Sequence, residues 1–210
     1  MATLSGWSRY NQSGDAGDRV NLHATYKVTT EPTVEPLTLA SLKESLRETT
    51  CDFDEELTRL LKAGRKQVEN DARIKIITQT VAVYCDRFPV GSIIQLRLPP
   101  VQSVTSIQYI DEDEVSQTLA SSKYYVDTST TPPRIWLDEN EYWPDTDDQP
   151  NAVTITYQAG YGDTAADAPV EAKLAIIEWC KMAWGRCDGD RRIYDNMINV
   201  LSWTGVGAVQ

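Results

Sequence analysis

The chain has 210 residues, enough for one domain or for a helical unit that carries a small β insertion. It holds 20 Lys and Arg against 31 Asp and Glu, which gives a formal net charge of -11. Because contacts with phosphates need a surplus of cations, this balance argues against a nucleic-acid-binding protein. An acidic surface would instead suit a protein past which DNA slides without sticking, provided that acidic residues line a channel.

The cysteines and the amino terminus exclude several other classes. The four cysteines contain no Cys-x-x-Cys pair, so neither a zinc ribbon nor a thioredoxin-like motif is indicated, and we interpret them as reduced, mostly buried thiols. The first residues lack the basic and apolar regions of a signal peptide, and no stretch approaches the roughly 18 apolar residues of a membrane span. We therefore expect a soluble protein, cytoplasmic when made, with no membrane partner.

Residues 1–35 are predicted to be a flexible arm, because they are rich in Gly, Ser, Asn, Asp and Thr and show no periodicity of useful length. Trp7 and Tyr10 are unusual for a solvated tail and suggest docking on a neighbouring subunit. A frayed terminus with stray aromatics is the alternative. The ordered part is expected to begin at Pro36.

Two helices are predicted after the arm. Thr38 is a plausible N-cap of the first, in which leucines recur at helical spacing. Asp52 and Glu55 form an approximate capping pair for the second, whose apolar residues from Phe53 to Val68 share one face. Both helices are expected to bury one stripe.

From Ile76 the apolar period changes to two residues, which predicts strands. Pro99 and Pro100 interrupt the run because proline removes a ladder donor. The acidic run 111–114 is predicted to be a hairpin tip. Further strands are expected at residues 104–110, 115–119, 124–126, 134–137 and 153–157.

The chain is expected to return to helix at Pro169, with Asp167 as the cap. One apolar stripe of this helix is broadened by further apolar residues; the stripe is Val170, Leu174, Ile177 and Trp184, and the additions are Ile176, Cys180 and Ala183. So broad a face suggests burial from two sides, by the chain's own first helices and by another subunit. A last helix is expected over residues 191–201.

These elements predict an α+β fold, in which a helical bundle of two N-terminal helices and the C-terminal helices carries an inserted small, mainly antiparallel β unit. The helical core is expected at residues 36–75 and 165–201 and the β-rich insertion at 76–164. The arm at 1–35 and a tail at 202–210 lie outside them.

The sequence favours no catalytic, cofactor-binding or metal site. His23 is the only histidine and lies in the predicted arm, so a Ser-His-Asp or Cys-His arrangement would need an unstructured base. The acidic clusters at 111–114 and 145–148 lack the ligand spacing of a calcium loop, which favours solvated turns. Residues 160–163 lack the Lys-Ser/Thr of a phosphate loop, and their glycines are interpreted as a turn between strand and helix. We expect that the protein is not an enzyme.

Five aromatic residues of the β region suggest an alternative function; they are Tyr124, Tyr125, Trp136, Tyr142 and Trp143. They would form a stacking platform for sugars or bases, although strand aromatics usually pack across a sheet and a base-binding surface should be basic. The alternative is thus a β-rich carbohydrate-binding module of a phage or bacterial structural protein. An acid-base hydrolase is a third interpretation, but the sequence does not indicate which carboxylates would meet.

Six short motifs follow one another along the chain: PLTLASLKESLR at 36–47, ITQT at 77–80, LPPVQSV at 98–104, YYVD at 124–127, WP at 143–144 and YQAGYG at 157–162. In this order they resemble the head-tail connector, or adaptor, proteins of long-tailed bacteriophages, in particular the longer members with a β insertion. The arm before Thr30 is longer than the family pattern, and the segment after Arg186 carries no family motif.

The resemblance implies a structural virion protein at the head-tail junction, assembled in the host cytoplasm. About a dozen copies would form a ring beneath the portal protein, with head-to-tail contacts between neighbours. DNA would pass through the lumen without sequence-specific binding, and the next neck or tail-completion protein would assemble on the ring.

Carried onto this chain, the resemblance implies intersubunit contacts on the helices at 52–69 and 169–184; the candidates are Leu57, Arg65, Lys173 and Trp184. Portal docking is expected on 191–203; the candidates are Ile193, Met197, Leu201 and Trp203. No residue is predicted to act in catalysis or to bind a cofactor or metal.

Overall fold

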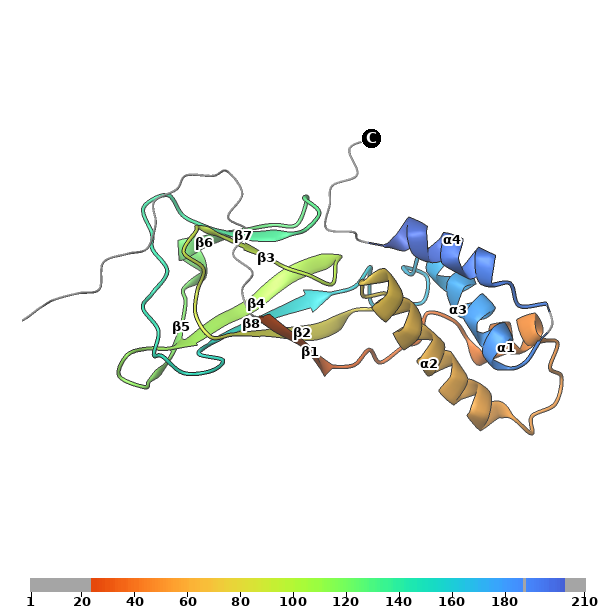
Figure 1. Ribbon diagram of the computed structural model, residues 1–210. Helices are drawn as coiled ribbons and strands as arrows, with labels where there is room; N and C mark the ends of the chain where they lie inside the picture. The colour runs from red at the N-terminus through yellow and green to blue at the C-terminus, as the bar shows by residue number, and fades with distance from the viewer. Residues whose placement is uncertain (1–23, 187, 203–210) are drawn as a thin grey trace, which may run out of the picture.

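A computed structural model describes residues 24–186 and 188–202 (Figure 1). It is a mixed α+β fold, with the helices gathered at one end and antiparallel sheets at the other. The predicted arm residues Trp7, Tyr10 and His23 and the docking candidate Trp203 lie outside the described residues. Within the described part, no helix is both long and apolar enough to cross a bilayer.

The main sheet has five antiparallel strands in the order β1-β2-β8-β4-β5. Their bounds are Ala24–Thr30 for β1, Gln79–Cys85 for β2, Val101–Ile110 for β4, Ser116–Thr118 for β5 and Val153–Ala159 for β8. Alternate residues of the central strand β8 are buried, as expected for a strand with one face on a core.

A second sheet of three strands, β3-β7-β6, packs against the first. Its strands are β3 at Ile93–Gln95, β6 at Tyr124–Asp127, after the short 3-10 turn Ser121–Lys123, and β7 at Arg134–Leu137. Ile94 and Ile135 of this sheet share a buried cluster with Val81, Ile155 and Tyr157 of the main sheet. The β part therefore has its own apolar core.

Strand β1 corrects the prediction of an arm that reaches residue 35. It pairs antiparallel with β2, from Ala24 opposite Cys85 to Thr30 opposite Thr80. Ala24 and Tyr26 pack against the β core, while the intervening side chains are exposed. The sheet thus includes a strand that precedes all the helices in the sequence.

In the described part of the chain, four helices form the other end; they are α1 at Leu39–Leu46, α2 at Asp54–Ala72, α3 at Val170–Ala183 and α4 at Arg191–Leu201. Each contributes to a second buried cluster, which includes Leu46 of α1, Val68 of α2, Ile176 of α3 and Tyr194 of α4. Two segments far apart in the sequence therefore build one helical core.

One of the three predicted helix N-caps is confirmed. Thr38 Oγ1 accepts a hydrogen bond from Ser41 N at 3.1 Å, which confirms the cap of α1. The cap predicted at Asp52 is wrong, because α2 follows Phe53 and has no side-chain cap. The cap predicted at Asp167 is also wrong, because its carboxylate accepts bonds from Thr164 in the preceding turn.

The turn from β8 to α3 depends on Gly160. Its φ of 141° lies in the region that disfavours other residues, and a Cβ there would lie 2.5 Å from Thr78 N. Gly160 N donates to Pro100 O at 2.8 Å, and Tyr161 N donates to Ile76 O at 3.0 Å. The interpretation of these glycines as a turn is therefore confirmed, and the turn joins sheet to helices.

Candidate functional surfaces

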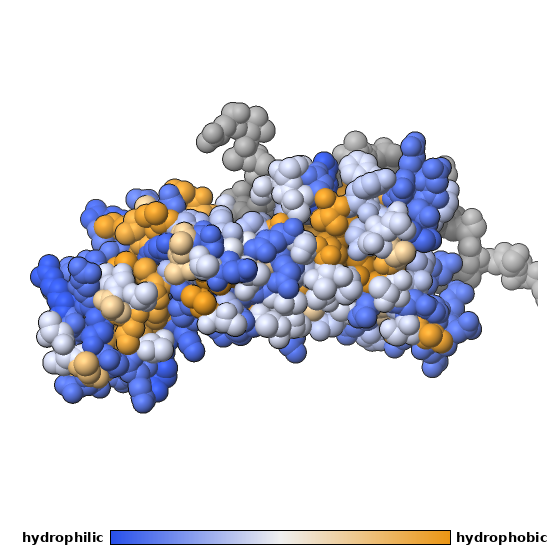
Figure 2. All heavy atoms as spheres, turned by 180° about the vertical axis from the view of Figure 1, so that it is seen from behind, coloured by the Kyte–Doolittle hydropathy of each residue, from blue (hydrophilic) through white to orange (hydrophobic). Residues whose placement is uncertain are grey.

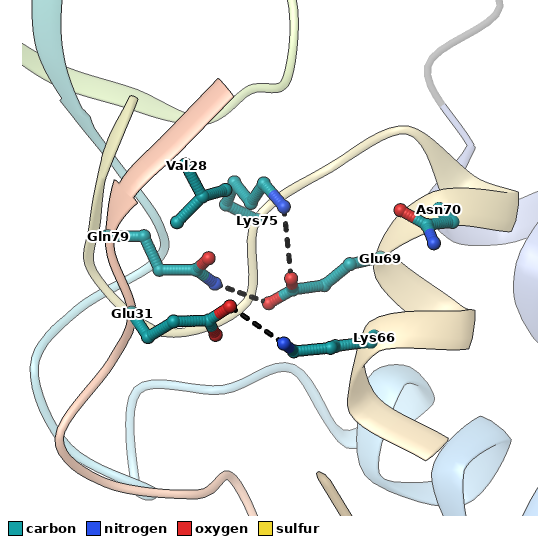
Figure 3. A pocket seen from close by; sticks show the side chains of 7 residues that line it. All are labelled: Val28, Glu31, Lys66, Glu69, Asn70, Lys75 and Gln79. Carbon is teal, nitrogen blue, oxygen red and sulfur yellow. Dashed lines mark hydrogen bonds and ion pairs between the residues drawn. The ribbon is translucent and has the colours of Figure 1, made fainter. Parts of the chain in front are cut away.

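A buried ion network lies where α2 meets β1 and β2; Figure 3 shows the part of it around Glu31, Lys66 and Glu69. The guanidinium of Arg65, 2% exposed, contacts three carboxylates. Arg65 Nε donates to Glu35 Oε2 at 2.8 Å, and the two terminal nitrogens donate to Glu31 at 3.1 Å and Glu69 at 3.3 Å. Arg65 therefore ties the connection between β1 and α1, which carries Glu31 and Glu35, to helix α2.

Glu69 continues the network toward the sheet. Its carboxylate accepts hydrogen bonds from Lys75 Nζ at 3.1 Å, Gln79 Nε2 at 2.6 Å and Ile76 N at 3.2 Å. Figure 3 shows these groups converging on a cavity of about 140 Å³. Every buried side-chain nitrogen and oxygen of the described residues has a partner, so the network is satisfied internally.

The network's electrostatics also indicate a structural role. Lys66 Nζ lies 2.7 Å from Glu31, and this hydrogen bond, with a further one from Arg65, holds the pKa of the Glu31 carboxyl below its ordinary value. A carboxylate kept charged by fixed cations is suited to an ion pair and not to proton transfer. We interpret the site as the joint that fixes α2 against the sheet.

Two of the predicted intersubunit residues are therefore interior residues. Leu57 is 0% exposed within the helical core, and Arg65 is enclosed by the network. Neither can contact a neighbouring subunit in this conformation. Lys173 and Trp184 are half-buried, and Trp184 packs edge-on against Phe53, with ring centroids 5.7 Å apart, and donates to Glu48.

Helix α3 has an apolar face that residues 24–186 and 188–202 do not cover. Ala172, Ile176 and Cys180 are buried, and α2 approaches them closely at Gly64. Val170 and Leu174 remain 64% and 42% exposed. Viewed from the side opposite to Figure 1, the helical end carries gathered hydrophobic side chains (Figure 2).

The predicted portal-docking residues do not form one exposed set. Ile193 and Val200 of α4 are exposed, whereas Met197 and Leu201 pack partly against the helical core. Tyr194, the residue after Ile193, is fully buried, and its hydroxyl donates a hydrogen bond to Asp71 at 2.6 Å. Helix α4 is thus part of the folded core as well as a surface element.

A groove of about 1000 Å³ opens on the β part beside β6 and β7. It gathers four of the five aromatics predicted to form a platform, namely Tyr125, Trp136, Tyr142 and Trp143, whereas Tyr124 packs against the β core. Tyr142 is 87% exposed. Trp143 is held in place, because its ring stacks on Phe88 at 4.9 Å and its Nε1 donates to Gly91 O at 2.8 Å. The sequence did not reveal this hollow, because its walls come from three separate segments.

The described residues offer little for catalysis or metal binding. In residues 24–186 and 188–202, no three His, Cys, Asp or Glu side chains gather closely enough to hold a metal ion. The carboxylate of Asp111 accepts hydrogen bonds from Val115 N and Gln117 in the β4-β5 turn, as expected of a solvated hairpin tip. Burial raises the pKa of the Cys85 thiol to about 11 and of the Cys180 thiol to about 12, which makes both poor nucleophiles.

Comparisons with known proteins define the fold. No protein-family model matches the sequence, and no curated protein matches it significantly. A chain from the neck of an empty GTA particle, computed with C6 symmetry, aligns with a TM-score of 0.73 and 20% identity over 88% of this chain and 98% of that one. GTA stands for gene transfer agent.

Two further structures agree. A chain from the virion of the native gene transfer agent particle has a TM-score of 0.70 and 20% identity over 87% of this chain and 97% of that one. A chain from the neck of the native GTA particle, computed with C12 symmetry, has a TM-score of 0.68 and 18% identity over 88% and 98%. The chain therefore shares the fold of chains from the neck and the virion of gene transfer agent particles.

Proposed function

We propose that the chain is a structural protein of a virion neck, a head-tail connector that acts by assembly and not by chemistry. The observation that carries the proposal is the fold match to a neck protein, which spans 88% of this chain and 98% of that one. The six sequence motifs resemble phage adaptor proteins and support the same role independently of the fold.

A ring beneath the portal protein is the assembly we propose, with about a dozen copies in head-to-tail contact. Structures with the same fold come from necks computed with C6 and C12 symmetry. The uncovered face of α3 supports an interface on this side, because Val170 and Leu174 are apolar and exposed beside Lys173. We place Trp184 at its border.

Portal docking is proposed on α4 and the residues that follow. Ile193 is the exposed apolar candidate on this helix. Met197 and Leu201 are only partly buried against the helical core, and their remaining exposed surface would add to the contact with the portal. The opposite side of the ring would receive the next neck or tail protein, and DNA would pass through the lumen. The protein would act in the virion at the head-tail junction after assembly in the host cytoplasm.

The docking proposal is tested by co-sedimentation with portal-bearing, DNA-filled capsids from the same phage genome. Truncation before α4 is unsuitable because it would remove the buried Tyr194. We expect Ile193→Glu, and separately removal of residues 203–210, to weaken capsid binding without unfolding the protein. Val115→Glu, an exposed site on the β4-β5 turn, is the matched control. Unchanged binding by both variants would refute docking through this end.

Carbohydrate binding is a second candidate, and the groove is the observation that favours it. Exposed rings of Tyr125, Trp136 and Tyr142 line one hollow, as expected for sugar stacking. A glycan array decides between the two candidates: binding that is lost on Tyr142→Ala would favour the carbohydrate module, and an array without binding would leave the neck role.

A further inference from the structure

The groove beside β6 and β7 combines aromatic faces with excess negative charge. Four acids line it and none of its lining residues is Lys or Arg; the acids are Asp127, Asp138, Glu139 and Glu141. Asp127 is paired with Arg134 at 3.1 Å and Glu141 with Lys123 at 2.9 Å. Among the described residues, Asp138 and Glu139 form no ion pair. The groove therefore carries two negative charges that no cation of the described residues pairs.

This chemistry selects a cationic occupant with aromatic neighbours. A guanidinium can lie on an indole or phenol face while it donates to a carboxylate, and Arg134 already lies 5.2 Å from the Trp136 ring centroid. Aromatic side chains of an occupant would stack on Tyr125 and Tyr142, whose rings are exposed. A strongly acidic partner would be repelled.

The chain's own amino-terminal segment has this composition. Residues 1–12 contain Trp7, Arg9 and Tyr10 and no Asp or Glu. Strand β1 begins at Ala24 opposite Cys85, and the groove wall begins at Pro89, four residues after Cys85. The segment is thus attached to the sheet at the end where the groove opens.

The connection between Tyr10 and Ala24 is long enough for residues 1–12 to reach the groove. The 13 residues between Tyr10 and Ala24 can span up to roughly 45 Å when extended, at about 3.3–3.6 Å per residue. Tethering also favours docking, because two binding elements joined within one chain meet at an effective concentration that reaches the millimolar range for short connections. Weak contacts therefore suffice to occupy the groove.

We propose that residues 1–12 of the same chain occupy the aromatic groove, with Trp7 and Tyr10 packed near Trp136 and with Arg9 paired to Asp138 or Glu139. The site is an intramolecular docking surface that covers the exposed rings. It does not depend on the neck function.

Hydroxyl-radical footprinting of the full chain tests the proposal, because it reports the accessibility of individual aromatic side chains. Trp136 and Tyr142 should be oxidised several times faster in a Trp7→Ala/Tyr10→Ala variant than in the unaltered chain. Arg9→Glu should have the same effect and Arg9→Lys should not. Tyr161, exposed at the joint with the helices, is the internal control and should be unchanged.

Two results would overturn the proposal. Equal oxidation of Trp136 and Tyr142 in the variant and the unaltered chain would show that the segment does not cover the groove. Protection that disappears on roughly hundredfold dilution would assign the occupant to a second copy, since a tethered segment is insensitive to protein concentration. The substitutions lie before the described fold, so loss of folding does not confuse either result.

Discussion

Individual residues of this protein are explained by burial and by fixed partners more than by reactivity. Glu31, Glu35 and Glu69 converge on Arg65 because the chain enters α1 from β1 alongside α2. No sequence pattern reveals this, since Glu35 and Glu31 lie 30 and 34 residues from Arg65. Arg65 was predicted to be an intersubunit contact from the family resemblance alone. Charged residues are rarely buried unless they are paired, and here the pairing comes from acids that the sequence does not place beside Arg65.

The cysteines provide a prediction at this scale. At pH 8, Cys51 should react with iodoacetamide much faster than Cys85 and Cys180, because it is exposed and they are buried. With a pKa of about 11, roughly one in a thousand Cys85 thiols is ionised at this pH. Peptide-resolved mass spectrometry measures the three rates. Alkylation of Cys180 as fast as Cys51 without denaturant would contradict the burial.

The joint between α2 and the sheet provides a second prediction. Arg65→Met should lower the free energy of unfolding by about 3–5 kcal/mol, because the buried Glu69 and the largely buried Glu35 would lose the cation that they share. Arg59→Met on the same helix is the matched control, since its pair with Glu55 is exposed and worth less than about 1 kcal/mol. Urea denaturation measures both; equal losses would mean that the network does not stabilise the joint.

At the scale of elements, periodicity predicted most of the helices and strands. Leucine spacing and Thr38 located α1, and apolar alternation located β2, β7 and β8. Strand β1 was missed, although Ala24, Tyr26 and Val28 alternate with polar residues, because the composition of the preceding residues dominated the prediction. Pairing with β2 orders a Thr-rich segment that is unremarkable in isolation.

The packing of α2 on α3 provides a third prediction. A Cβ at Gly64 would lie 3.1 Å from both Cys180 Sγ and Trp179 Cε3. Gly64→Val should therefore destabilise the protein by about 1–3 kcal/mol through overpacking. Ala63→Val, at an exposed position one residue earlier, should cost less than about 1 kcal/mol through helix propensity. A stable Gly64→Val variant would show that the two helices are farther apart.

At the scale of the whole molecule, the apolar surface that the described residues leave exposed supports the proposed assembly. The sequence indicated that α3 is apolar on more than one side, and the structure covers the Ile176 side while Val170 and Leu174 stay exposed. The identity of the partner could not follow from periodicity, because a stripe shows that a face is apolar and not what covers it. The fold likeness to a chain from a GTA neck supports the proposal that a second copy of this chain covers the face.

The α3 face provides a fourth prediction. Leu174→Glu should reduce the number of copies bound per capsid at least roughly tenfold, since burying an unpaired charge at an interface costs more than 1.4 kcal/mol per contact. Its circular dichroism and melting curve should match those of the unaltered chain, because Leu174 is 42% exposed. Quantitative mass spectrometry of sedimented capsids counts the copies; a full complement would exclude this face from the ring.

The most direct test of the neck role is cryo-electron microscopy of portal-bearing, DNA-filled capsids from the same phage genome, incubated with the purified protein. The account predicts a collar of density beneath the portal, into which copies of this fold can be placed with ring symmetry. A vertex that stays unoccupied, with the protein shown to be folded in the same sample, would contradict the connector role and favour the carbohydrate-binding module.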